Sequence, residues 1–151
     1  MPNNNPLGAT EQQSIAKAII NLINSNYPYL PAGTIKYQSL DTRKSSMAIY
    51  NLTNSFIDKR YINGNYLATY RFSIVYRNIP TNTNKRIDSE EILGSIADWL
   101  LSINLNSDIV LSRSRVIDNI SISAPPVLYK QYGNGTEDYH VILSLKYKKE
   151  V

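Results

Sequence analysis

The segment from Tyr61 to Arg77, YINGNYLATYRFSIVYR, constrains the fold more than any other part of the chain. Aromatic and small or aliphatic side chains fill its even positions from 66 to 76, and polar or charged ones fill most of the odd positions. Such alternation is typical of a β-strand with one buried and one solvated face. The Asn63-Gly64 pair predicts a two-residue hairpin loop, because a type I′ turn needs positive φ at both positions. We therefore expect a long central hairpin.

A two-residue loop also sets the register of this hairpin. It places Tyr61 opposite Tyr66 and Ile57 opposite Tyr70, so that the even-numbered face gathers apolar side chains from both strands. We interpret this face as the core and the opposite face, which holds Asp58 and the arginines, as the solvated one. A binding platform made from the aromatic stripe is the alternative interpretation.

The first of two helices is predicted over residues 11–26. Its apolar side chains recur at helical spacing, namely Ile15, Ile19, Leu22 and Ile23. Thr10 and Gln13 have the spacing of a capping box. The pattern stops at Tyr27-Pro28, because the residue before a proline avoids the helical region.

The second helix is predicted from Asp88 to about Ile103, after a polar loop over residues 78–87. Asp88 is a favourable N-cap residue with Glu91 three positions later. We assign Asp88, Glu90 and Glu91 to the first turn, where the helix dipole favours negative charge. The apolar stripe consists of Ile92, Ile96, Trp99 or Leu100, and Ile103.

Strands are predicted over 35–40, 47–52, 116–123, 127–132 and 139–147, with a break at Pro125-Pro126 and a turn at 133–135. The order of elements predicts an α+β fold: a mostly antiparallel sheet with a long central hairpin and two main helices packed on one side. The 151 residues suit a single domain over 1–151, and we expect the Asn- and Pro-rich residues 1–9 to be flexible.

The chain offers little for catalysis. It has no cysteine, and a single histidine, His140, cannot supply a zinc site. A general base at His140 oriented by Asp138 is the catalytic interpretation, and an exposed strand histidine is the alternative, in which His140→Ala costs no more than about 0.5 kcal/mol. Glu137-Asp138 fits turn chemistry. No phosphate-binding glycine motif is present. We expect no enzymatic activity, no catalytic residue, no cofactor and no bound metal.

The net charge of +4 is unevenly distributed. Residues 34–87 carry nine basic and two acidic side chains, and residues 88–151 carry six and nine. This pattern fits either nucleic-acid binding through the middle block or head-to-tail pairing of copies. A stacking platform needs aromatic and cationic side chains on one face, whereas the predicted register separates most tyrosines from Arg71 and Arg77. No apolar run reaches the roughly 20 residues that span a bilayer, so no membrane partner is expected.

Three stretches resemble the tail terminator (minor capsid or tail-completion) proteins of long-tailed bacteriophages and phage-tail-like particles. They are FIDKRYINGNYLATYRFSIVYR, RIDSEEILGSIADWLLS after a polar loop, and the ending EDYHVILSLKYKK. The resemblance covers most of residues 11–149 and lies in the order and texture of the elements. Asn63-Gly64-Asn65 stands where many such proteins carry Asp-Gly-Ser.

The resemblance implies a non-enzymatic virion protein at the head-proximal end of a tail, present in the host cytoplasm during assembly. Such proteins form a ring, commonly a hexamer, that caps the tail tube, stops its polymerisation and joins the head connector, so that DNA only passes through. A head–tail connector or head-completion protein is the near alternative, and a basic nucleic-acid-binding module a further one. Ring contacts join unlike surfaces. The expected assembly interface uses polar and basic loop residues: Arg43, Lys44, Asn82, Lys85, Arg86, Arg113 and Arg115.

Overall fold

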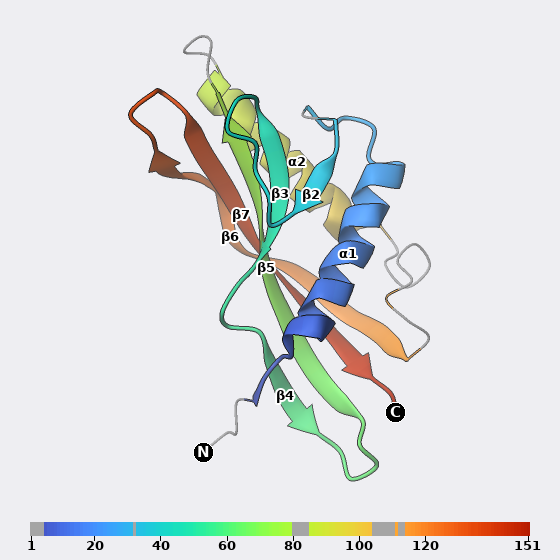
Figure 1. Ribbon diagram of the computed structural model, residues 1–151. Helices are drawn as coiled ribbons and strands as arrows, with labels where there is room; N and C mark the ends of the chain where they lie inside the picture. The colour runs from blue at the N-terminus through green and yellow to red at the C-terminus, as the bar shows by residue number, and fades with distance from the viewer. Residues whose placement is uncertain (1–4, 32, 80–84, 104–110, 112–113) are drawn as a thin grey trace.

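The computed structural model describes residues 5–31, 33–79, 85–103, 111 and 114–151 (Figure 1). They contain two helices, α1 (Ala9–Asn26) and α2 (Lys85–Ser102), and one seven-stranded sheet. The strands are β1 (Asn5–Pro6), β2 (Ile35–Tyr37), β3 (Ser46–Asn51), β4 (Phe56–Arg60), β5 (Tyr66–Asn78), β6 (Arg115–Gln131) and β7 (Glu137–Lys149). This single-domain α+β fold with a mostly antiparallel sheet is the predicted class.

Strand β5 is the centre of the sheet. One of its edges pairs with β7 over the full length of both strands, and β6 pairs with the far side of β7. The other edge is divided, since β4 pairs with the first part of β5 and β3 with the second part. β1 adds to β4, and β2 lies parallel to β3 as the only parallel pair among the described strands. The long hairpin β4–β5 projects beyond the helices at one end of the molecule (Figure 1).

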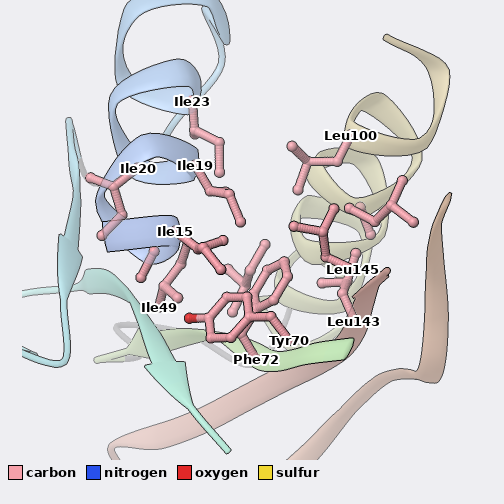
Figure 2. Close-up of a cluster of buried hydrophobic side chains, with 14 of the residues drawn as sticks. Ile15, Ile19, Ile20, Ile23, Ile49, Tyr70, Phe72, Leu100, Leu143 and Leu145 are labelled. Carbon is pink, nitrogen blue, oxygen red and sulfur yellow. The ribbon is translucent and has the colours of Figure 1, made fainter. Parts of the chain in front are cut away.

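Both helices pack on one face of the sheet, as predicted (Figure 2). Their isoleucines and leucines point toward the even-numbered side chains of β5 and the odd-numbered ones of β7. Among the labelled side chains are Ile15, Ile19, Ile23, Tyr70, Phe72, Leu100, Leu143 and Leu145. All of them are fully buried. Burying each such side chain contributes about 1.5–3 kcal/mol, so this layer is the main source of stability. The even face of β5 is therefore the core face.

The apolar stripes of both helices match the prediction, but the residues at which the two helices begin do not. Gly8 is the N-cap of α1 and makes no side-chain cap bond, so the capping box predicted at Thr10 does not form. Helix α2 begins at Lys85, and Asp88 lies within its first turn instead of at the N-cap; Glu90 and Glu91 fall beyond that turn. Lysine and arginine are good helix formers, which explains the earlier start. Neither described helix is long and apolar enough to cross a bilayer.

The loop between β4 and β5 has three residues, not the predicted two. The N–H of Tyr61 donates to the carbonyl of Asn65 at 2.8 Å, and the N–H of Gly64 donates to the carbonyl of Tyr61 at 3.0 Å. Gly64 has φ +92°, whereas Asn63 does not have positive φ. This is a type I turn completed by a glycine bulge, a common three-residue hairpin connection. Asn-Gly suits both kinds of loop.

The longer loop changes the register of the hairpin. Ile57 pairs with Ala68 instead of Tyr70, because a bulge follows Ile57. A shift of two residues preserves its face, and Ile57 is buried as predicted. Tyr61 shifts by one residue to lie opposite Asn65, so it leaves the core face and is 39% exposed. The predicted pairing of Tyr61 with Tyr66 was wrong.

The last third of the chain forms two long strands instead of three shorter ones. β6 runs without interruption through Pro125-Pro126, where the prediction had a break. Proline is tolerated there because β6 is an edge strand and its outer N–H groups need no ladder partner. Glu137 and Asp138 start β7 and are buried at 3% and 1% exposure, so their assignment to turn chemistry was also wrong.

The beginning of the chain is tied down more than expected. Asn5 and Pro6 form β1 against β4, and the buried Leu7 donates its N–H to the carbonyl of Ser55 at 3.0 Å. Residues 5–9, expected to be flexible, therefore form a short strand, a buried contact and the start of α1. Residues 1–4 lie outside the described part of the chain.

Candidate interaction surfaces

The sheet face opposite the helices, called the open face below, has no described helix on it. Strand pairing defines its members as the odd positions of β5 and the even positions of β3 and β7. The larger side chains among them are Tyr50, Leu67, Arg71, Val75, Arg77, Asp138, His140, Ile142, Lys146 and Lys148. On β4 and β6, Lys59, Val116, Val127 and Lys130 pair with members of this set.

At one end of the open face Arg77 forms an ion pair with Asp138, whose carboxylate is buried. Nε and Nη2 of Arg77 donate to the two carboxylate oxygens of Asp138 at 2.8 and 3.0 Å. The hydroxyl of Tyr132 donates to the same carboxylate at 2.7 Å and accepts from Arg77 at 2.8 Å. Hydrogen bonding to Asp138 raises the pKa of Arg77 further above its usual range, so the guanidinium stays charged. Nη1 also donates to the carbonyl of Asp41, which attaches the preceding loop.

Next to this network, Tyr129 of β6 stacks on His140 of β7. Their ring centroids are 4.3 Å apart and the rings are inclined by 15°. Burial lowers the pKa of His140, and burial also raises the pKa of Tyr129 to about 12. Both rings are therefore neutral at pH 7. Tyr129 remains 47% exposed, so one part of this aromatic pair faces solvent.

The opposite end of the open face is cationic. The ammonium groups of Lys59 and Lys148 lie 5.1 and 5.8 Å from the ring centroid of Tyr61. Beside them, Ile62 at the hairpin tip is completely exposed. An open pocket of about 570 Å³ at this end is lined by Arg60, Tyr61, Ile62, Asn63, Asn65 and Lys148. We call this region the hairpin tip.

A second pocket, of about 410 Å³, lies between the end of α1 and the first half of α2. Tyr27, Tyr29 and Ile92 give it apolar walls, and Asp88 and Glu91 give it negative charge. Tyr29 is 77% exposed although its ring contacts that of Tyr27 edge-on. We call this region the acidic pocket.

Of the residues predicted for the assembly interface, the three whose side chains the structure describes, Arg43, Lys44 and Arg115, do not form one cluster. Arg43 and Lys44 are exposed in a turn whose N–H groups donate to the carboxylate of Asp41 at 2.8 and 3.3 Å. Arg115 lies at the other end of the sheet, paired with Lys149. Lys85 and Arg86 begin α2, with side chains outside the described part of the structure, and Asn82 and Arg113 lie outside it altogether.

Arg115 has partners within its own chain. Its Nε donates to Glu11 of α1 at 3.2 Å, and the hydroxyl of Tyr66 donates to the same carboxylate at 2.7 Å. Arg115 also donates to the carbonyl of Leu111. This arrangement joins α1 to β5 and β6, so the visible role of Arg115 is to bind elements of one subunit together.

The geometry does not assemble the catalytic pair considered from the sequence. The carboxylate of Asp138 receives hydrogen bonds from Arg77 and Tyr132, and His140 is packed on Tyr129. In the described residues, no group of three or more His, Cys, Asp or Glu side chains is close enough to hold a metal ion.

Sequence reasoning missed the hairpin tip and the stack of Tyr129 on His140. The exposure of Tyr61 depends on the three-residue loop, and the position of Tyr129 depends on shifts of register along β6. The exposed Ile62 beside Asn-Gly was the one local signal, because an apolar residue in a turn has no core to enter.

Comparison with models of known protein families gives no match, and comparison with curated protein sequences gives none either. The fold and the surfaces identify a single-domain α+β protein with an open sheet face, and they do not define a narrower class.

Proposed function

We propose that this protein is a non-enzymatic virion structural protein, a tail terminator that forms a ring at the head-proximal end of a phage tail. In this role it caps the tail tube, stops its polymerisation and joins the head connector, while DNA only passes through the ring. The proposal begins from the resemblance of the hairpin, of α2 and of the final strand. The structural observation that carries it is a pair of unlike exposed surfaces, the hairpin tip and the acidic pocket.

These two surfaces lie at opposite ends of the molecule. In Figure 1 the β4–β5 hairpin is at the bottom, and the C-terminal end of α1 is near the top. The hairpin tip presents Ile62 among basic side chains, and the acidic pocket presents Tyr29 among carboxylates. A ring closes when one surface of each subunit meets a different surface of the next. Opposite charge orients such a contact, and apolar side chains stabilise it.

Insertion of the hairpin tip of one subunit into the acidic pocket of the next explains the exposed apolar side chains at both ends. The complementary charges come from Arg60 on the tip and Glu91 in the pocket. A head-completion protein would use the same kind of contact. The two roles differ in the neighbouring ring, which is a tail tube in one case and a portal in the other.

The test measures the mass of the purified protein in solution, alone and with the tail-tube protein of the same genome. We expect a ring, or a monomer that becomes a ring on tube ends. Arg60→Glu and Glu91→Arg should each weaken assembly, and the double variant should restore it, while Lys17→Glu on α1 serves as a control. A protein that stays monomeric at high concentration and leaves tubes uncapped contradicts the proposal. If the protein binds portal rings and does not bind tail tubes, the result supports the head-completion role instead.

A further inference from the structure

The open face carries an excess of positive charge. Pairing places seven cations on it: Lys36, Lys59, Arg71, Arg77, Lys130, Lys146 and Lys148. Glu137 of β7 falls on the core face, so the other carboxylates on these strands are Asp58, Asp138 and, in the bulge opposite Lys146, Asp118. Arg77 and Asp138 neutralise each other, and Asp58 accepts a hydrogen bond from Thr69. A polyanion laid along this face would meet mainly cations.

Exposed aromatic rings share this face with the cations. Tyr61 lies between Lys59 and Lys148 at one end, and Tyr129 lies on His140 at the other. The predicted register had separated the tyrosines from the cations, and the three-residue loop brings Tyr61 to the cationic side. Aromatic and cationic side chains on one sheet surface form the arrangement that binds unpaired bases by stacking and their phosphates by charge.

The separation of the two aromatic sites suggests the size of the ligand. Lys148, beside Tyr61, pairs with Leu67, and His140, beside Tyr129, pairs with Val75. These partners are eight residues apart on β5, which is roughly 26 Å at about 3.3 Å per residue. At the roughly 3.4 Å spacing of stacked nucleotides, this distance corresponds to about eight nucleotides.

The surface between the two sites combines polar side chains with Tyr50 and Ile142, which both pair with Ser73. Ser73 and Ser144 are buried on the open face, and the hydroxyl of Ser144 lies 2.6 Å from that of Ser123 on β6. Arg71, on the same face, pairs with Ser144. Because both serines are covered by their neighbours, a ligand would contact the larger side chains around them, of which Arg71 offers a phosphate contact.

We propose that the open face binds single-stranded nucleic acid of about eight nucleotides, with bases stacked at Tyr61 and Tyr129 and phosphates bound by the lysines and Arg71. Duplex is disfavoured because its bases are already stacked and cannot reach the rings. This binding does not depend on ring formation, although Tyr61 and Lys148 belong both to the open face and to the hairpin tip.

The experiment is fluorescence anisotropy with labelled oligothymidylates of 4 and 12 nucleotides and a 12-base-pair duplex, at about 50 mM salt. We expect the longer single strand to bind best, because the shorter one cannot reach both sites. Raising the salt to about 200 mM should weaken binding about 50-fold if four phosphates are contacted. Absence of binding by any of the three probes at low salt, or a preference for duplex, overturns the proposal.

Substitutions then locate the site. Tyr61→Ala and Tyr129→Ala should each weaken binding of the 12-nucleotide strand about 5- to 100-fold, as loss of one stacked base does, and Tyr61→Phe should preserve it. Lys146→Gln should reduce the dependence of the binding affinity on salt. Lys17→Gln on α1 should change neither the affinity nor its salt dependence. Lys148 and Tyr61 both also line the hairpin tip, so Lys148 is left intact and Tyr129→Ala, which lies outside that pocket, is the substitution that separates nucleic-acid binding from assembly.

The alternative occupant is a second copy of the chain. If Tyr129→Ala and Lys146→Gln change the mass in solution and leave oligonucleotide affinity unchanged, the open face is a contact between copies and the proposal fails. If Lys17→Gln and Lys146→Gln lower the oligonucleotide affinity equally, the nucleic acid is attracted by the overall charge and not by a site on the open face, and this result also overturns the proposal.

Discussion

Arg77 on β5 and Asp138 on β7 lie opposite each other and form a two-bond ion pair whose carboxylate is 1% exposed. Removing one partner of a buried pair leaves the other charge without compensation. Asp138→Ala should therefore lower the free energy of unfolding by about 3 kcal/mol, measured by urea denaturation at pH 7.

Tyr132→Phe is the matched variant for this pair. It removes one hydroxyl that bonds to both charges and leaves the ion pair in place. A loss of about 1 kcal/mol is expected. If Asp138→Ala costs no more than Tyr132→Phe, the ion pair does not stabilise this end of the sheet.

The two β-hairpins share one turn design. In each, an Asn side chain accepts from the N–H two residues later, at 3.0 Å for Asn63 and 3.1 Å for Asn134. The following glycines, Gly64 and Gly135, have φ +92° and +89°. Replacing either by alanine forces a left-handed conformation on a residue with a Cβ atom, and each change should cost about 1–2 kcal/mol in thermal unfolding.

Gly133 provides the control for these turns. It does not have positive φ, and a Cβ atom added there meets nothing within 4 Å. Gly133→Ala should therefore be neutral or slightly stabilising. Equal destabilisation by Gly133→Ala and Gly135→Ala would contradict the role given to the left-handed glycine.

The fold could be predicted because its signals are local. The alternation on β5 and β7 and the stripe of α1 identify the core face without knowledge of their neighbours. The start of α2 was predicted wrongly because the end of a helix depends on the surrounding structure. A break was predicted at Pro125-Pro126 because the sequence alone does not show that β6 is an edge strand, which tolerates proline.

The interaction surfaces were less predictable than the fold. One extra loop residue moves Tyr61 from one face to the other, and Asn63-Gly64 fits both loop lengths. Asp138 was read as part of a turn because its partner, Arg77, is 61 residues away in sequence. Long-range pairing and bulges carry no short sequence signal.

The contact between α1 and β5 should weaken at alkaline pH. Burial, followed by the hydrogen bond to Glu11, raises the pKa of Tyr66 to about 12 from an ordinary value of 10. The native state holds this proton more tightly than the unfolded state, so its contribution to stability is complete below pH 10 and is lost between pH 10 and 12. Tyr66→Phe should cost about 1–2 kcal/mol at pH 7 and reduce the slope of stability against pH in that window.

Glu11→Gln tests the same contact from the other side. It keeps an acceptor for Tyr66 but removes the charge that binds Arg115. We expect Glu11→Gln to lower the free energy of unfolding at pH 7 by less than Glu11→Ala does, as measured by urea denaturation. An alkaline slope unchanged in Tyr66→Phe would assign the transition to other buried tyrosines.

The stack of His140 on Tyr129 should make stability sensitive to acid. Burial lowers the pKa of His140 below its usual 6.5, so the unfolded state binds the proton more readily. The resulting contribution is complete above pH 6.5 and declines as the pH falls through the lowered value. His140→Ala should cost about 1 kcal/mol at pH 7.5, more than the roughly 0.5 kcal/mol expected for an exposed histidine, because an aromatic contact is lost. His140→Phe should keep the stack and reduce the change in the free energy of unfolding between pH 7.5 and 5, measured by urea denaturation. If this variant keeps the pH dependence of the wild-type protein, the acid-sensitive group is not His140.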